Sequence, residues 1–103
     1  MPTVYITAPP EAATELAETL VEERLAACVN RLDCCSTYRW DGDVVSDEEV
    51  ILLAKTTDEQ YTALESRTEE LHPYDVPCIE RFDEEAVRPS FGEWVAESVG
   101  SEK

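Results

Sequence analysis

The sequence predicts an α+β domain whose elements follow the order β-α-β-β-α-β, with one further helix near the C-terminus. Three observations support this prediction. Apolar residues recur at helical spacing in residues 10–25 and 57–71, whereas residues 3–7 are β-branched or aromatic. The dipeptide Asp41-Gly42 separates two further strand-like segments, which is typical of a hairpin. With 103 residues, the chain can form one core but not two.

The first strand and the first helix are predicted near the N-terminus. Residues 3–7 favour a strand, and Pro9 and Pro10 end it. Pro10 suits the first turn of a helix because its missing N–H would have no partner there, and Glu11 complements the helix dipole. The predicted inner face of this helix carries Ala13, Leu16, Ala17, Leu20, Val21 and Leu25.

A long β-hairpin is predicted in the middle of the chain. Its first arm begins near residue 28 and continues through residues 38–40, and its second arm covers residues 44–54. Asp41 and Gly42 tolerate the positive φ angles of a type I′ turn. Both arms exceed the usual strand length of about 5–6 residues. We therefore expect the hairpin to project from the domain, with edges that need a partner.

The second helix is predicted to begin after Thr57, which forms a capping-box pattern with Gln60. It is predicted to end at His72, because the residue before a proline disfavours the helical region. Its inner face carries Tyr61, Leu64, Thr68 and Leu71.

The last strand is predicted over residues 76–82, at a sheet edge, because Pro77 has no N–H for a ladder bond. A final helix is predicted between a capping box of Ser90 with Glu93 and a stop at Gly100. Its apolar residues are Phe91, Trp94, Val95 and Val99. Two βαβ crossovers that share an antiparallel sheet give a ferredoxin-like split β-α-β fold, and we expect residues 1–103 to form one such domain.

The chain is strongly acidic, with 24 Asp and Glu against 8 Lys and Arg, a net charge of −16. This charge repels phosphate backbones and anionic lipid surfaces, so neither nucleic acid nor a membrane is an expected partner. The acids are spread along the chain, which favours adaptation to concentrated salt over a docking surface for a basic partner or a diffuse cation-attracting field. No leader-like segment is recognised, so a cytoplasmic location is expected.

The sequence contains no recognisable catalytic motif, and we predict no catalytic or cofactor-binding residue. The four cysteines, Cys28, Cys34, Cys35 and Cys78, include no C-x-x-C pair and are expected to remain reduced. A nucleophile pair of Cys78 with His72 has no assignable third member. Neighbouring acids such as Glu48-Glu49 are expected to form solvated faces.

Residues 72–80 concentrate the residue types that bind transition metals. His72 and Cys78 offer the imidazole and thiol that copper and zinc prefer, and Asp75 and Glu80 offer carboxylates. We predict these four as the candidate metal ligands, with no cofactor otherwise required. The alternative is a proline-bracketed turn in which the polar side chains make structural hydrogen bonds.

At this cluster the sequence resembles the CutA divalent-cation-tolerance family. The similarity is distributed in order along nearly the whole chain, in residues 7–9, 25–30, 38–42, 49, 55–56, 72–74, 76–77, 91 and 94. The resemblance implies a ferredoxin-like fold, tight trimers joined through strand edges, a role in divalent-cation tolerance and, for some members, copper binding. It also implies that no enzymatic activity is established, and some animal relatives are linked to acetylcholinesterase anchoring.

The chain departs from the family pattern at positions near the predicted metal site. Asp75 and Cys78 replace two glutamates of the family motif, Ile6 stands where certain bacterial members have cysteine, and Phe91 replaces a usual tyrosine. Of the metal candidates, only His72 is carried over unchanged.

We therefore expect a non-enzymatic homotrimer involved in tolerance of copper or another divalent cation. Two alternatives stay open, namely a PII-like sensor of a small ligand and a purely structural or protein-interaction trimer. The predicted interface residues are aromatic: Tyr38, Trp40, Tyr74 and Trp94.

Overall fold

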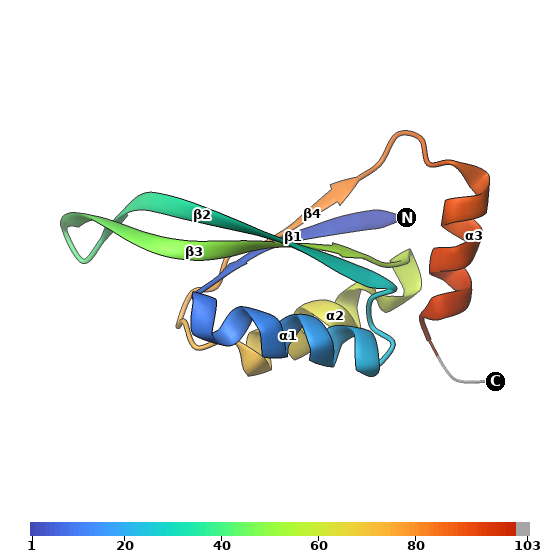
Figure 1. Ribbon diagram of the computed structural model, residues 1–103, viewed down its shortest axis with the longest axis horizontal. Coiled ribbons are helices and arrows are strands. Elements are labelled where there is room, and N and C mark those ends of the chain that lie inside the picture. The colour runs from blue at the N-terminus through green and yellow to red at the C-terminus, as the bar shows by residue number, and fades with distance from the viewer. Residues whose placement is uncertain (101–103) are drawn as a thin grey trace.

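The computed structural model describes residues 1–100 (Figure 1). The strands and helices follow one another in the order that the sequence predicts. In chain order they are β1 (Pro2–Ala8), α1 (Pro10–Glu22), β2 (Cys28–Trp40), β3 (Asp43–Lys55), α2 (Asp58–Leu71), β4 (Ile79–Asp83) and α3 (Pro89–Ser98).

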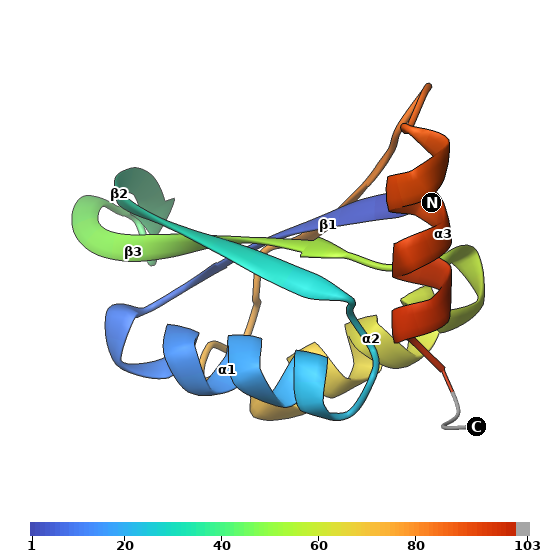
Figure 2. The same ribbon diagram turned by 45° about the vertical axis from the view of Figure 1, so that its right-hand side comes forward.

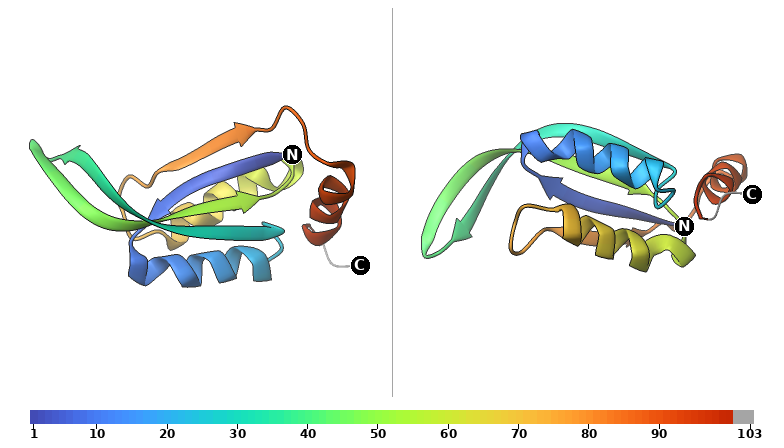
Figure 3. Two further views of the ribbon diagram at one scale, coloured as in Figure 1. Left: turned by 45° about the horizontal axis from the view of Figure 1, so that its top comes forward. Right: turned by 90° about the horizontal axis from the view of Figure 1, so that it is seen from below.

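The four strands form one antiparallel sheet in the order β2-β3-β1-β4. Helices α1 and α2 lie side by side on one face of this sheet, as Figure 3 shows from below. No helix of residues 1–100 covers the opposite face, which we call the open face (Figure 1). The predicted ferredoxin-like α+β class is confirmed.

The core lies between the sheet and the two helices, because alternate strand residues point to the helical side. Val4 and Ile6 of β1 and Leu52 of β3 are fully buried there, against Leu20 of α1 and Leu64 of α2. Burying side chains of this size contributes about 1.5–3 kcal/mol each. The residues that alternate with these along each strand point to the open face.

The predicted inner face of α1 is wrong at two positions. Val21 is 40% exposed, and Leu25 lies beyond the helix, which ends at Glu22. Arg24 adopts a positive φ of 61° and turns the chain back toward the sheet. Leu25 still packs against the core from this turn, so its burial was predicted correctly although its secondary structure was not.

Neither predicted capping box forms its side-chain hydrogen bonds. Thr57 is the N-cap of α2, but only its backbone oxygen accepts the N–H of Gln60, at 3.2 Å. Helix α3 begins at Pro89 with Arg88 as its N-cap, so Ser90 lies inside the helix. The fixed φ of proline suits the first helical position and moves the start ahead of the predicted cap.

The last strand is shorter than predicted. It begins at Ile79, and Pro77 and Cys78 belong to the segment that precedes it. The predicted edge position is confirmed, because β4 pairs only with β1.

The hairpin projects beyond the rest of the domain (Figure 1). With the hairpin included, the structure measures 47 × 26 × 20 Å. All thirteen residues of β2 pair with β3, from Cys28 opposite Lys55 to Trp40 opposite Asp43. Strand β1, however, reaches only residues 50–55 of β3. The outer part of the hairpin, residues 34–49, is therefore a two-stranded ribbon without a third strand.

Helix α3 packs across the end of the sheet, where Val95 and Val99 bury against Ala27 (Figure 2). Arg24 holds its C-terminal end. The guanidinium donates from Nε to the carbonyl oxygen of Gly100 at 2.7 Å and from a terminal nitrogen to that of Glu97 at 3.0 Å. These bonds satisfy carbonyl groups that have no partner within a helix.

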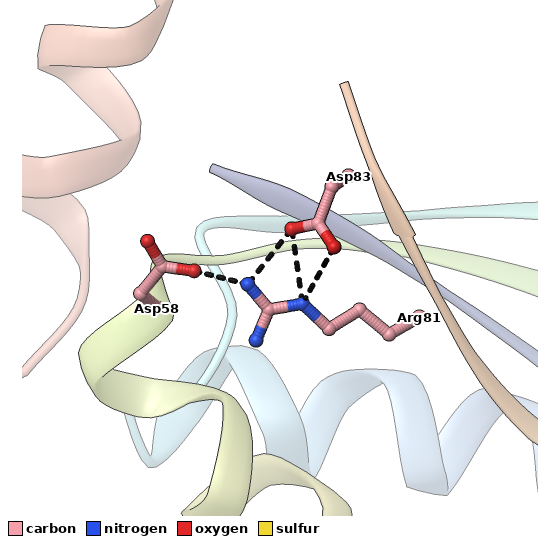
Figure 4. Close-up of polar contacts among 3 residues, drawn as sticks. All are labelled: Asp58, Arg81 and Asp83. Atoms are coloured by element: carbon pink, nitrogen blue, oxygen red, sulfur yellow. Dashed lines mark hydrogen bonds and ion pairs between the residues drawn. The ribbon is translucent and has the colours of Figure 1, made fainter. Parts of the chain in front are cut away.

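Arg81 links β4 to the beginning of α2 (Figure 4). It hydrogen-bonds Asp83 on its own strand, with Nε 3.0 Å from Oδ1, and forms an ion pair with Asp58 in the first turn of α2. Its guanidinium also lies 5.0 Å from the centre of the Tyr61 ring. Hydrogen bonding to Arg81 lowers the pKa of Asp83.

Two glycine-to-alanine substitutions, one in the hairpin turn and one in α3, should change the unfolding free energy in opposite directions. Asp41 and Gly42 have φ angles of 55° and 88°, as a type I′ turn requires. Gly42→Ala should destabilise the fold by about 1–2 kcal/mol, because a Cβ is strained in this region even in open space. Gly92→Ala should stabilise it by about 0.5–1 kcal/mol, since this helical glycine leaves ordinary room for a methyl group. Denaturant unfolding measures both, and equal shifts would contradict this account of the turn.

Candidate functional site

A cleft of about 640 Å³ lies on the open face, where the ribbon leaves the sheet and the segment between α2 and β4 passes close to it. Its floor comes from residues of β1, β3 and β4 that point away from the helices, such as Thr7, Glu49 and Glu80. The ribbon supplies one wall, and residues 73–78 supply the other. The volume is within the range of about 300–1,000 Å³ that is usual for small-molecule sites.

Two kinds of side chain dominate the lining. The aromatic residues are Tyr5, Tyr38, Trp40 and Tyr74, and the acidic residues are Glu49, Asp75 and Glu80. No Lys, Arg or His side chain lines the cleft.

Glu49 is the most buried of these acids, with 6% of its surface exposed. Its Oε2 accepts a hydrogen bond from the Tyr74 hydroxyl at 3.0 Å. Burial, reinforced by this bond to a carboxylate, raises the pKa of Tyr74 to about 12. The expectation that Glu48-Glu49 forms only a solvated face is wrong for Glu49, since the alternation of β3 turns it onto the sheet surface beneath the 73–78 segment.

Tyr38 is held by a second bond of the same kind. Its hydroxyl donates to Oδ2 of Asp47 at 2.6 Å across the ribbon, and this hydrogen bond is the main cause of its raised pKa. The hydroxyls of both tyrosines in the cleft walls are therefore held by carboxylates.

His72 fixes the segment that forms the second wall. It is buried, with 7% exposed, and caps the C-terminal end of α2. Its Nε2 lies 2.7 Å from the carbonyl oxygen of Thr7, and its Nδ1 accepts the backbone N–H of Tyr74 at 3.2 Å. A carbonyl only accepts, so Nε2 carries the proton and Nδ1 is bare. Both ring nitrogens are thus engaged by the backbone of β1 and of the 73–78 segment.

The other predicted metal ligands are only partly brought together. The Cys78 thiol lies 3.7 Å from Oε1 of Glu80, and both line the cleft with Asp75. Burial, followed by the Glu80 charge, raises the pKa of this thiol. Within residues 1–100, no three His, Cys, Asp or Glu side chains lie close enough to hold one metal ion.

Comparison with known proteins agrees with this architecture. The model of a family described as CutA1 divalent ion tolerance protein matches residues 2–98. The chain belongs to the CutA1 divalent ion tolerance family. The CutA family has no established catalytic activity.

Three CutA relatives illustrate the similarity. The divalent-cation tolerance protein CutA of Thermus thermophilus is 44% identical over 99 residues, which cover 94% of this chain and 96% of the relative. The structure of the PII-like protein CutA from Nostoc sp. PCC 7120 has a TM-score of 0.94 at 32% identity, covering 97% and 98% of the two chains. That of the periplasmic CutA from Archaeoglobus fulgidus has a TM-score of 0.92 at 33% identity, covering 97% and 100%.

The chain offers no membrane-spanning helix among residues 1–100, since none combines sufficient length with an apolar sequence.

The Tyr74–Glu49 bond predicts a specific pH dependence. The raised pKa of Tyr74 means that the folded state favours the neutral phenol. Its contribution to the unfolding free energy is therefore complete below the pKa of about 10 in the unfolded chain, and it is lost as the pH rises toward about 12. Tyr74→Phe should lower the unfolding free energy by about 1–2 kcal/mol below pH about 10. The difference from the wild type should vanish as the pH approaches about 12.

Urea unfolding at several pH values measures this difference. Burial also raises the pKa of Tyr61, outside the cleft, so Tyr61→Phe shows how much pH dependence arises without the Glu49 bond. A Tyr74→Phe effect that stays constant across this pH range would exclude the proposed coupling.

Proposed function

We propose that this chain acts as a non-enzymatic homotrimer in divalent-cation tolerance, with the open face as the surface between subunits. The observation that carries the proposal is the combination of an uncovered sheet face with a ribbon that has no third strand. Membership of the CutA family supports the role in cation tolerance.

The open face has the composition of an interface. Leu32 and Phe82 project from it and are 47% and 50% exposed, and Leu53 lies between them on β3. Monomeric proteins rarely leave large apolar side chains clustered on one face. The second and third copies of this chain are the occupants that fit, because they also pair the free ribbon edges.

We propose that the chain is not an enzyme because His72 and Cys78 are not arranged as a base and a nucleophile. Both nitrogens of His72 are engaged by backbone groups, and the Cys78 thiol has a raised pKa. A thiol activated by an imidazole needs the opposite arrangement, namely a free nitrogen beside a thiol of lowered pKa.

Light scattering on the purified protein tests the assembly. The wild type should have three times the chain mass. Phe82→Glu should dissociate, because it places a charge in the interface, whereas Val21→Glu should remain trimeric, since Val21 lies on the exposed side of α1. A monomeric wild type, or equal masses for the two variants, would contradict the interface.

We propose further that the acid excess is an adaptation to concentrated salt. Three chains bring together three times the net charge of −16, and this repulsion is screened over about 3 Å in molar salt against about 10 Å at 0.1 M. Trimer content in the same light-scattering experiment should therefore rise with KCl. Constant or falling assembly would favour a basic partner as the explanation of the acidity.

Copper binding is proposed for the predicted set of His72, Asp75, Cys78 and Glu80, with Cys78 and Glu80 as the donors that already lie together. Cu(I) prefers thiolate. Cys78→Ser should weaken anaerobic Cu(I) binding in molar KCl at least about tenfold, because inner-sphere ligation survives screening while diffuse attraction does not.

His72→Gln separates ligation from positioning in the same titration. Weakened binding with an unchanged circular dichroism spectrum would assign His72 as a ligand. Equal binding by the wild type and both variants would remove the copper site from the proposal.

A cytoplasmic location is proposed because all four cysteines are free in the structure, as expected of a reducing compartment. Fractionation of cells that express the tagged chain tests it. The relative from Archaeoglobus fulgidus is described as periplasmic, and recovery of this chain outside the cytoplasm would assign it there as well.

A second candidate function is the sensing of a small ligand, as in PII-like proteins. The cleft favours it, because its size and mixed aromatic and polar lining are those of a ligand site. The relative from Nostoc is described as PII-like. Tyr38, Trp40, Tyr74 and Trp94 were predicted as interface residues. We propose that the first three border the cleft at the boundary between subunits, whereas Trp94 lies on α3 outside the cleft.

A further inference from the structure

The chemistry of the cleft lining restricts the ligand that it can hold. The twelve lining residues include three acids and no basic side chain, so phosphates and carboxylates would be repelled. This excludes nucleotides as preferred ligands and favours a cation.

Glu49 places a buried carboxylate within the cleft. The residue is 6% exposed, and it takes part in none of the ion pairs of residues 1–100. The single hydrogen bond from Tyr74 satisfies one carboxylate oxygen and contributes no positive charge. A buried carboxylate without a counter-ion is unfavourable, so a cationic ligand beside it would be stabilised.

A hard divalent ion that takes only oxygen ligands does not match this arrangement. A metal such as Ca²⁺ or Mg²⁺ requires six or more oxygen ligands around one point, including waters. No three acidic, His or Cys side chains of residues 1–100 converge in this way. The negative charge is distributed over the cleft, which suits a larger cation of low charge density.

The aromatic lining supplies the matching surfaces. In the single chain Trp40 is 53% exposed and Tyr38 is 37% exposed, and in the proposed trimer both would border the cleft at the subunit boundary. The Tyr38 and Tyr74 hydroxyls are occupied by carboxylates, and the Tyr74 ring also lies 4.8 Å from the His72 ring, so both tyrosines offer the cleft ring surface rather than a free hydroxyl. Aromatic faces around a cation are the arrangement that recognises quaternary ammonium groups.

We propose that the cleft binds a small organic cation, an alkylammonium group held by the ring faces of Tyr38, Trp40 and Tyr74 and by the carboxylate of Glu49. This inference rests on the second candidate function, the binding of a small ligand in the cleft. It names the chemical class of that ligand.

Tetramethylammonium is the probe. Three comparison ligands are tert-butanol, which is a neutral molecule of similar shape, Mg²⁺, which tests a metal site, and ATP, which tests a nucleotide site. Ligand-observed NMR on the assembled protein in molar NaCl gives the affinities with surface charge screened. Tetramethylammonium should bind saturably, tert-butanol and ATP should not, and Mg²⁺ should not displace the ammonium. Binding of tert-butanol with equal affinity, or displacement by Mg²⁺, would overturn the proposal.

Two matched pairs of variants locate the site. Trp40→Leu should weaken tetramethylammonium binding roughly three- to thirtyfold, as the loss of a cation–π contact predicts, whereas Trp94→Leu on α3 should not. Glu49→Gln should weaken it by a similar factor while still accepting the Tyr74 hydrogen bond, whereas the exposed neighbour Glu48→Gln should not. Unchanged binding in both Trp40→Leu and Glu49→Gln would overturn the proposal.

The outcomes also separate this inference from the functions on which it depends. Saturable ATP binding without ammonium binding would keep the ligand-sensing function and exclude the organic cation. Saturable binding of none of the probes would exclude both. A trimer that forms normally in either case would leave the first proposed function standing.

Discussion

The unequal lengths of neighbouring strands determine most of the architecture. Strand β3 has thirteen residues, but β1 pairs with only its last six, residues 50–55. The remaining ribbon has backbone donors and acceptors on both sides that no strand of the same chain satisfies. A two-stranded hairpin is at best marginally stable in water. The proposed subunit contacts and the position of the cleft both follow, since the cleft lies where the third strand is missing.

The second wall of the cleft depends on a side chain rather than on a strand. His72 joins the carbonyl of Thr7 to the N–H of Tyr74 and so fixes the chain after α2 against the end of β1. This position brings the Tyr74 hydroxyl to Glu49. The residue that the sequence marks as a metal ligand is thus the one that arranges the aromatic and acidic groups of the cleft.

The sequence predicted the features that depend on local chemistry. Strand and helix periodicities, the Asp41-Gly42 turn and the edge position of β4 follow from steric preferences that act within a few residues. The burial of Glu49 could not be predicted in the same way, because it arises when a segment 25 residues away covers β3. For the same reason, the hydrogen bonds of His72 were a stated alternative that the sequence alone could not choose. Val21 was misplaced because helical spacing gives a face but not its width.

The way Arg24 holds α3 has a consequence for how this part of the protein can diverge. Its guanidinium binds the carbonyl oxygens of Glu97 and Gly100, and its own carbonyl accepts the N–H of Gly100. Every amino acid supplies a carbonyl, so the bond to residue 97 does not depend on the side chain there, whereas the φ of 83° at Gly100 favours glycine. The outward residues of the last helical turn are therefore free to drift during evolution. A change at Arg24 would remove both guanidinium bonds and leave the helix end held by the backbone bond of Gly100 and by the packing of Val95 and Val99.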